Sequence, residues 1–389
     1  MNKLKYIAYY SDPDETKSRK TEPSADTKAD YIISALKAAG YEVSVVSMCY
    51  EKNRVGLLKK SAAYVTEKNG TQVHFVPSAT SKYRVMRLFA RQLMKRSIRQ
   101  LVKKECIDTD CKIVIYHSLG MYDVIKLLKR HNKAFTLEVE EIYSDVMTKR
   151  KKQNRKKEDF MFSAAQSYIF STELLNKEIN TENKPYAVCN GTYTVAESLA
   201  KEKIFDDKEK IHCVYAGTLD PRKGGATAAA TAGGFLPENY HMHILGFGSA
   251  AETENMKKLT EQVNSKAKAT VTYDGLLTGE EYLKFIQSCD IGLSTQDPNA
   301  DFNGTSFPSK ILSYMSNGLR VVSVRIPVVE QSAVGDMLYY YNNQTPEEIA
   351  KAIMAVDIND GYDSRLYLSG LDKKFAEEVG NILDTKKVV

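Results

Sequence analysis

Short apolar runs alternate with helical stretches along the whole chain. In the first half, strand-like runs such as LKYIAYY, YEVSVVSM and KIVIYHS are separated by stretches with helical periodicity. Because these runs are apolar on both faces, they are typical of strands buried in a parallel sheet, and their order indicates a doubly wound α/β fold. The last runs of this half are YIFST and YAVCNG, so we assign residues 1–191 to a first domain.

A second alternation of strands and helices begins after the polar segment 192–210, which we interpret as a hinge. Residues 211–363 hold six further strand-like runs, HCVYAG, MHILGFG, ATVTYDG, DIGLST, LRVVSVR and MLYYY. They predict a second α/β domain, followed by a helix within 364–389 that crosses back to the first. Two such sheets joined by a hinge would bind a ligand in the cleft between the carboxyl ends of their strands.

The composition fits a soluble protein of two domains, with 389 residues of which 43% are hydrophobic and 27% charged. No apolar run approaches the roughly 18 residues of a membrane span, and the apolar start is shorter than a secretory signal. We therefore expect a cytoplasmic protein. The six cysteines form no CxxC pair, and His241 and His243 only alternate along one strand, so we predict no metal site.

Positive charge is concentrated in two segments of the first half. Residues 82–104 carry nine basic side chains and no acidic one, and residues 149–157 carry seven more in what we interpret as a loop. Arg84, Arg87 and Arg91 recur at helical spacing, and basic amphipathic helices bind anionic membrane surfaces. We expect peripheral binding at the inner face of a membrane. A core-facing helix with a solvated basic side is the alternative, and nucleic acid is not expected because no known binding pattern accompanies the charge.

The segment VYAGTLDPRKGG carries the first candidate site. Gly217 ends a strand, and Arg222 and Lys223 come just before a helix of small residues. Two cations beside the free N–H groups of a helix start would seat a diphosphate, although an ordinary solvated turn has the same pattern. Downstream, Gly246 and Gly248 in HILGFGS allow either close approach of a ligand or a tight turn.

The segment NGTSFPSKILSYMSNG carries the second candidate site. Pro308 suits the first turn of a helix and Gly318 suits its end. The helix start would direct its positive dipole end toward a ligand. The side chains near it suit a sugar hydroxyl or a phosphate: Thr305, Ser306, Ser309 and Lys310. A plain loop and packing helix remain the alternative.

Candidate residues in the first half follow the ends of strands. His117 ends KIVIYHS, where it would open toward the cleft, or else hydrogen-bond a neighbouring loop. Glu138, Glu140 and Glu141 end another strand and are costly to bury, so we expect them to line the cleft and orient a hydroxyl group of a ligand, unless the loop is simply exposed. Ser24 would face the cleft from the start of the first helix.

The ordered set YAGTLDPRKGG, HILGFGS, YDGLLTGEEYLKFIQSCDIGLST and FPSKILSYMSNGLRVVS resembles the donor-binding half of GT-B nucleotide-sugar glycosyltransferases, in particular glycosyltransferase family 4. The resemblance is most specific over residues 211–325. It implies two Rossmann-like domains facing across a cleft, with Gly217, Arg222 and Lys223 on the donor diphosphate. It further implies that the base stacks on Gly275, Leu276 and Leu277, and that Thr305, Ser306, Phe307, Ser309 and Lys310 line the donor site.

By this resemblance we expect a retaining hexosyltransferase. The donor would be a UDP- or GDP-sugar and the acceptor a glycan or lipid-linked glycan, in the synthesis of bacterial surface polysaccharide. No cofactor or metal is expected if Arg222, Lys223 and the helix start near Pro308 neutralise the leaving diphosphate.

One departure from the family pattern leaves other functions open. Many members carry two glutamates where this chain has Thr305 and Ser313. Neither side chain can replace a carboxylate. The alternatives are therefore a catalytically silent glycan-binding or scaffold partner, and another enzyme of the same architecture such as a sugar-nucleotide epimerase.

Overall fold

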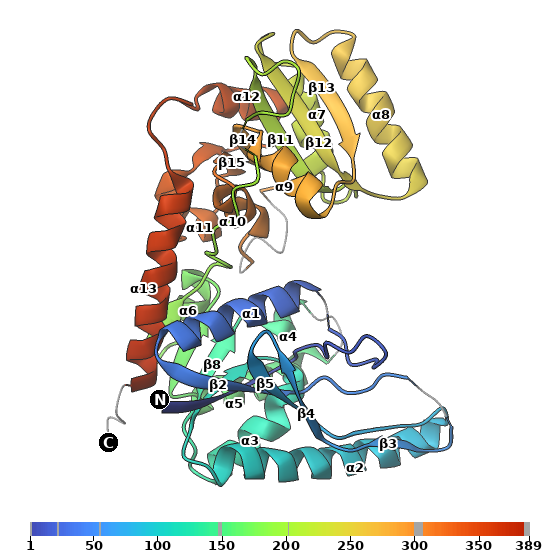
Figure 1. The fold of residues 1–389 in the computed structure, drawn as a ribbon, viewed down its shortest axis with the longest axis vertical. Coiled ribbons are helices and arrows are strands. Elements are labelled where there is room, and N and C mark those ends of the chain that lie inside the picture. Colours follow the sequence, from blue (N-terminus) through green and yellow to red (C-terminus); the bar gives the residue numbers. More distant parts are fainter. Residues whose placement is uncertain are drawn as a thin grey trace. The chain divides into compact units, whose positions relative to one another are not determined.

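The computed structural model describes residues 2–21, 23–53, 56–146, 150–200, 202–298 and 306–384. The chain forms two compact units, which Figure 1 shows as ribbons. Unit 1 comprises Met1–Cys189 and Lys373–Val389, and unit 2 comprises Asn190–Asp372. Within the described residues, we find no helix with the length and apolar character needed to cross a membrane.

Unit 1 is built on a largely parallel sheet. Its strands are β1 (Asn2–Ala8), β2 (Tyr41–Ser47), β3 (Lys59–Ser61), β4 (Tyr64–Lys68), β5 (Thr71–Phe75), β6 (Ser78–Thr80), β7 (Lys112–Tyr116), β8 (Thr136–Val139), β9 (Ser167–Phe170) and β10 (Tyr186–Val188). Eight of them pair in the order β10-β9-β8-β7-β1-β2-β5-β4, all parallel except β4, while β3 and β6 form a separate antiparallel pair. The central strand β7 buries Ile113, Val114 and Ile115 in succession, as expected for a strand covered on both faces.

Helices cover both faces of this sheet. They are α1 (Pro23–Ala38), α2 (Arg84–Val102), the π-helical turn η1 (Lys103–Ile107), the 3-10 turn η2 (Leu119–Met121), α3 (Tyr122–Arg130), α4 (Tyr143–Val146), α5 (Lys151–Ala164), α6 (Glu173–Ile179) and the end of α13 (Ser364–Asp384). In Figure 1, α1 lies on one side of the strands and α2 and α3 on the other. Phe375 of α13 stacks on Tyr31 of α1, with ring centroids 5.9 Å apart.

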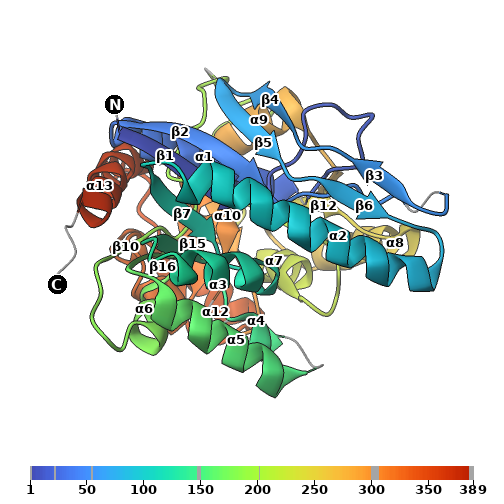
Figure 2. The same cartoon turned by 90° about the horizontal axis from the view of Figure 1, so that it is seen from below.

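The two basic segments are both helical. The helix expected at 82–104 is confirmed as α2 with η1, and α2 packs beside β6 (Figure 2). The loop expected at 149–157 is wrong for residues 151–157, because these form the first turns of α5, while Lys149 lies outside the described residues. Glu158 explains the difference. It is fully buried, and its carboxylate accepts hydrogen bonds from the N–H groups of Tyr143 and Ser144 at 2.8 and 2.9 Å.

Unit 2 contains a fully parallel sheet of six strands. They are β11 (Ile211–Thr218), β12 (Tyr240–Phe247), β13 (Thr270–Gly275), β14 (Ile291–Ser294), β15 (Arg320–Val324) and β16 (Tyr339–Tyr341), in the order β13-β12-β11-β14-β15-β16. The helical elements are α7 (Gly225–Gly233), α8 (Ala250–Asn264), α9 (Gly279–Gln287), α10 (Ser309–Ser316), α11 (Pro327–Glu330), η4 (Gly335–Met337), α12 (Pro346–Met354) and the start of α13. All six predicted strands are confirmed, and because they are parallel, their carboxyl ends share one edge.

The segment 192–210 belongs to unit 2 and contains no helix or strand among its described residues. Its backbone is attached to α9, because Gln287 Oε1 accepts hydrogen bonds from the N–H groups of Leu199 and Ala200 at 2.8 and 3.1 Å. A hinge role for this segment stays a prediction.

Candidate active site

A cavity of about 260 Å³ opens at the carboxyl edge of the unit 2 sheet. Three elements form its walls, namely the end of β11, the end of β14 and the start of α10. The lining residues are Tyr215, Lys223, Ser294, Thr295, Gln296, Ser306, Phe307, Pro308, Ser309 and Lys310. Because β11 and β14 are neighbours in the sheet, their ends come together at this point, which is where open α/β sheets bind ligands.

Lys310 brings positive charge into this cavity. Its Nζ lies 4.8 Å from the ring centroid of Tyr215. A Cβ atom on Gly217 would lie only 2.6 Å from the same Nζ, so glycine at this position leaves the space that the ammonium occupies. Burial and, second, the charge of Lys223 lower the pKa of Lys310. Neither lysine forms an ion pair with a described residue, so both charges remain available to a ligand.

The start of α10 adds backbone donors to the two lysines. Pro308 is the N-cap, and no side chain caps the helix. The first N–H groups of a helix have no partner within the helix and lie at its positive dipole end. Phe307, directly before the N-cap, is 9% exposed and packs in the core. Two ammonium groups and an uncapped helix start can together bind a diphosphate.

The structure does not bring Arg222 into this cavity. The Arg222 side chain is 87% exposed and pairs with Asp220, with Nη2–Oδ2 and Nε–Oδ1 distances of 2.6 and 2.9 Å. Hydrogen bonds from Arg222 lower the pKa of Asp220 to about 2. The cation pair expected at Arg222 and Lys223 is therefore replaced by Lys223 and Lys310, which come from two different elements.

The remaining predicted donor residues that the structure describes lie outside the cavity wall. Gly246 lets the ends of β11 and β12 approach, because a Cβ there would overlap the carbonyl oxygen of Gly217. Gly248 precedes the capping box of Ser249 and Glu252 that begins α8. At the end of β13, Gly275 has a φ of +79°, Leu276 is 60% exposed and Leu277 is half-buried. Thr305 lies outside the described residues, and Ser313 is exposed on α10.

A second cavity, of about 450 Å³, lies in unit 1 at the carboxyl ends of β1 and β7. Four tyrosines dominate its wall, and Ser24 and Lys28 reach it from α1. The lining residues are Tyr6, Ala8, Tyr9, Thr21, Ser24, Ala25, Lys28, Ala29, Tyr116, Ser118, Leu119, Gly120 and Tyr143. The structure thus places Ser24 in the wall of the unit 1 cavity, while its position facing a cleft between the domains stays a prediction.

Two of the predicted glutamates lie beside Lys28. Lys28 Nζ is 3.4 Å from Glu140 Oε1 and 3.1 Å from the carbonyl oxygen of Cys189. Glu138 is fully buried, and its Oε2 accepts a hydrogen bond from the Tyr6 hydroxyl at 2.6 Å. Burial, and then the charge of Glu140, raise the pKa of Glu138 to about 7. Glu141 is half-buried, and burial raises its pKa too.

The expectation that the His117 side chain opens toward the cleft is wrong. Its side chain is 1% exposed and lies against the rings of Tyr143 and Phe162, with centroids 5.4 and 5.0 Å away. Burial lowers the pKa of His117 to about 4. His117 Nε2 lies 3.5 Å from the buried Glu158 carboxylate. The imidazole therefore packs inside unit 1 and does not line the cavity.

Sequence reasoning missed several cavity residues. In unit 2 these are Tyr215 and the three residues at the end of β14, Ser294–Gln296; in unit 1 they are Lys28 and the four tyrosines. Most of them stand at or just beyond the carboxyl ends of strands that the apolar pattern had located. That position was the signal that would have found them.

Two units, each with a twisted sheet of mainly parallel strands and a cavity at its carboxyl edge, define the GT-B fold. Solved structures with this fold include a sucrose-phosphate synthase from Thermosynechococcus elongatus, with TM-score 0.62 and 13% identity, covering 98% of each chain. An α,α-trehalose 6-phosphate synthase from Burkholderia multivorans has TM-score 0.61 and 10% identity, covering 98% of this chain and 96% of the other.

A UDP-forming α,α-trehalose-phosphate synthase from Burkholderia xenovorans, in complex with glucose-6-phosphate, is similar at TM-score 0.55 and 12% identity, covering 98% and 97%. No family model matches the chain, and no curated protein matches it significantly. At these identities the likeness establishes the fold.

Proposed function

We propose that the protein is a glycosyltransferase that uses a UDP- or GDP-sugar donor. The observation that carries this proposal is the unit 2 cavity, where Lys223, Lys310 and the start of α10 supply positive charge with no described counter-ion. The departing nucleoside diphosphate gains negative charge as the bond to the sugar breaks, and fixed positive groups stabilise that charge. The UDP-forming activity in the names of similar structures supports a nucleotide-sugar donor.

The base and the sugar of the donor would lie on opposite sides of the positive groups that bind the diphosphate. By the family resemblance, Gly275, Leu276 and Leu277 stack on the base, and Ser306 and Ser309 hydrogen-bond the distal phosphate or the sugar. Arg222 joins the diphosphate only if it leaves Asp220. We expect retention of anomeric configuration and transfer of a hexose.

The unit 1 cavity favours a glycan over a sugar phosphate as acceptor. Its one described lysine, Lys28, is already engaged by Glu140, and the buried Glu138 adds further negative character. A phosphate would find little free positive charge there, whereas tyrosine rings and hydroxyl groups suit the apolar faces and hydroxyls of a sugar. We infer a glycan or lipid-linked glycan acceptor, in bacterial surface polysaccharide synthesis.

The exposed face of α2 supports peripheral binding to an anionic membrane. Val85, Leu88 and Phe89 are 78%, 66% and 54% exposed, and they stand among the exposed or half-buried cations Arg84, Arg87 and Arg91. Apolar side chains can insert at the headgroup boundary while each basic residue near an anionic leaflet contributes about 1 kcal/mol. Membrane binding of this kind would bring the protein close to a lipid-linked acceptor at the inner face of the membrane.

Product analysis tests the proposed reaction. The protein is incubated with UDP- and GDP-sugars, with and without a glycan acceptor, and free nucleoside diphosphate is measured. We expect release that depends on the acceptor. Conversion of the donor sugar without an acceptor would identify an epimerase, donor binding without any turnover would favour a silent partner, and failure to bind either nucleotide would refute the proposal.

Vesicle sedimentation tests the membrane role separately. The wild-type protein is expected to sediment with anionic vesicles at low salt and to remain in solution with neutral ones. Arg84→Glu/Arg87→Glu/Arg91→Glu should abolish sedimentation. The matched control is Lys257→Glu/Lys266→Glu/Lys268→Glu, which changes the same number of exposed charges in unit 2. Equal sedimentation of the two triple variants would contradict membrane binding through α2.

A further inference from the structure

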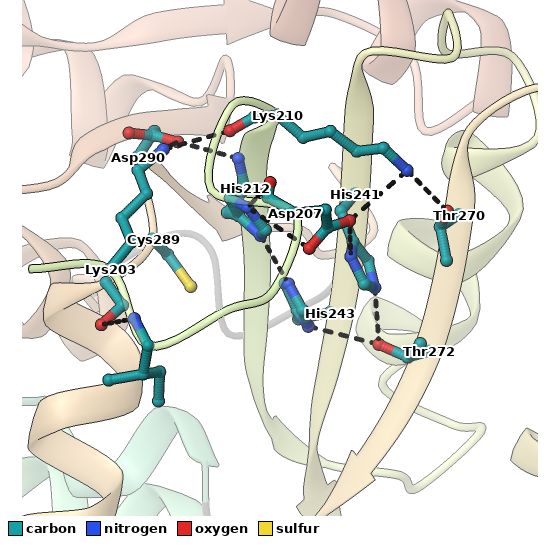
Figure 3. A network of polar contacts seen from close by, with 12 residues as sticks. Lys203, Asp207, Lys210, His212, His241, His243, Thr270, Thr272, Cys289 and Asp290 are labelled. Atoms are coloured by element: carbon teal, nitrogen blue, oxygen red, sulfur yellow. Dashed lines mark hydrogen bonds and ion pairs between the residues drawn. The ribbon is translucent and has the colours of Figure 1, made fainter.

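Three histidines of unit 2 lie together on one face of the sheet (Figure 3). His212 is on β11, and the parallel register pairs it with His241 on β12. His243 follows two residues later and therefore points to the same face. Thr272 and Asp274 of the next strand, β13, complete the cluster. No member lines the candidate active site, which lies across β11 at the end of β14.

The prediction of no metal site considered only the alternation of His241 and His243 along one strand. The structure adds His212 from β11, and one ring nitrogen of each histidine lies within 4.8 Å of the others. Ring nitrogens this close together could coordinate one shared ion, so the absence of a metal site stays a prediction. The hydrogen bonds around the three rings decide where an ion would bind.

Outer contacts fix the hydrogen positions on the three rings. His212 Nε2 lies 3.1 Å from the carbonyl oxygen of Asp207, so Nε2 carries the hydrogen and Nδ1 is an acceptor. His243 Nε2, at 3.0 Å from that Nδ1, must then donate to it. His241 Nδ1 donates to the Asp207 carboxylate at 3.0 Å. Neutral His241 and His243 are therefore left with lone pairs on Nε2 and Nδ1, respectively.

These lone pairs converge on the hydroxyl group of Thr272. His241 Nε2 and His243 Nδ1 each lie 3.2 Å from Thr272 Oγ1, and Asp274 Oδ2 lies 2.8 Å from it. The hydroxyl has one hydrogen for three acceptors. In addition, His243 Nδ1 and Asp274 Oδ2 face each other at 3.2 Å. This corner of the cluster, formed by His241, His243, Thr272 and Asp274, therefore has more hydrogen-bond acceptors than hydrogens. A bound cation would provide a partner for the remaining lone pairs.

We propose that this corner binds a divalent transition-metal ion of the zinc class, with His241 Nε2, His243 Nδ1 and Asp274 Oδ2 as ligands. Two imidazoles and one carboxylate suit zinc, cobalt or nickel, whereas magnesium and calcium prefer oxygen ligands only. The 3.2 Å between His243 Nδ1 and Asp274 Oδ2 is close to the roughly 3.3 Å that separates two ligands of tetrahedral zinc at bond lengths of about 2.0–2.1 Å. Thr272 or water supplies a fourth position.

The groups around this corner match the surroundings that a metal-bound imidazole needs. Each proposed histidine ligand donates its other N–H to a fixed acceptor, His241 to Asp207 and His243 to His212. Outer hydrogen bonds of this kind orient ligating rings and hold the required tautomer. Phe205 stacks on His212 and His243, with centroids 4.1 and 4.6 Å away. Asp274, 23% exposed, gives an ion access from solvent.

The ion would connect β12 to β13 and so stabilise unit 2 without taking part in sugar transfer. Its binding can therefore be measured whether or not the proposed function is correct. The protein, freed of metal by a chelator and dialysed, is titrated with Zn²⁺ by calorimetry and with Co²⁺ by visible absorption. We expect one ion per chain, d–d bands of a nitrogen- and oxygen-ligated Co²⁺, and a higher melting temperature with either ion.

Three variants locate the site. His243→Ala and the near-isosteric Asp274→Asn should each weaken binding at least tenfold, and Asp207→Asn, which changes an outer partner, about 10- to 100-fold. His131→Ala, an exposed histidine at the end of α3, should bind as the wild type does. Circular dichroism confirms that each variant is folded.

Two results would overturn the proposal. One is the absence of binding to the wild type at a large molar excess of either ion. The other is unchanged affinity in Asp274→Asn, which would place the ion elsewhere.

Discussion

Replacing Lys310 with methionine tests the candidate diphosphate site most directly. The substitution removes the ammonium and keeps most of the side-chain volume against Tyr215 and Gly217. A hydrogen bond between charged partners contributes about 1.5–3 kcal/mol, which corresponds to about 10- to 150-fold in Kd. Because Lys310 is half-buried and has no described counter-ion, its charge is screened less than a surface charge. We therefore expect a loss in the upper part of this range.

The pH dependence provides a second signature of Lys310. Burial and the charge of Lys223 lower its pKa in the free protein, and a bound diphosphate raises it again. Binding therefore takes up a proton at alkaline pH. The wild-type Kd should increase as the pH rises through the lowered pKa, below the ordinary lysine value of 10.5. Lys310→Met should lack this part of the pH dependence.

Calorimetric titration with UDP and GDP measures both effects, and thermal unfolding confirms that the variants are folded. The matched control is Arg222→Met, which removes one positive charge from the neighbouring turn. Because Arg222 is paired with Asp220, its loss should change Kd by less than about threefold. The reasoning fails if Lys310→Met binds both nucleotides as the wild type does, or if Arg222→Met loses as much affinity as Lys310→Met.

Two further substitutions test residues that contact the lining of each cavity, Gly217 beside Lys310 and Glu138 beside Tyr6. Gly217→Ala should weaken nucleotide binding in the same titration, but by less than Lys310→Met, because its Cβ would shift the Lys310 ammonium without removing its charge, and the backbone needs no positive φ. Unchanged Kd would show that Gly217 does not position Lys310. Burial raises the pKa of Glu138 to about 7, above its ordinary value of 4.5. Ionisation of Glu138 is therefore less favourable in the folded protein than in the unfolded chain. The free energy of unfolding should consequently fall as the pH rises from about 5 to 7. Glu138→Gln should remove this decrease, which urea unfolding at several pH values measures. If the free energy of unfolding of Glu138→Gln falls with pH in parallel with that of the wild type, the assignment to Glu138 is refuted.

The elements of the fold were largely predictable because buried parallel strands are apolar on both faces. Such a run needs no partner to be recognised, and every strand of unit 2 was found in this way. The start of α5 was not predicted, because this helix depends on a contact with another element, α4. Lys151 to Lys157 are polar and charged, and the element is held by Glu158, whose carboxylate binds the backbone of α4. A run of polar residues alone does not distinguish a loop from a solvent-exposed helix.

The candidate site was predictable as a region but not as a set of partners. The sequence placed cations after β11 and a helix start at Pro308, yet it paired Arg222 with Lys223. Asp220, two residues before Arg222, was a visible signal that the guanidinium would be neutralised within the turn. The Lys223–Lys310 pair joins residues far apart in the chain and needs the β11–β14 pairing. His117 shows the opposite case, in which the residue after a strand turns into the core because α5 covers it.

The cations near the two cavities fall into two groups, those that are paired with a carboxylate and those that have no ion-pair partner among the described residues. Arg222 and Lys28 each have a carboxylate within hydrogen-bond or ion-pair distance, so their charges are already compensated in the free protein. Lys310 and Lys223 stand close enough for the charge of one to lower the pKa of the other, and neither has an ion-pair partner among the described residues. Two like charges in a shared cavity raise the free energy of the free protein, and a bound dianion removes that cost. The arrangement gains stability when an anion binds, which is the property that a diphosphate-binding site requires.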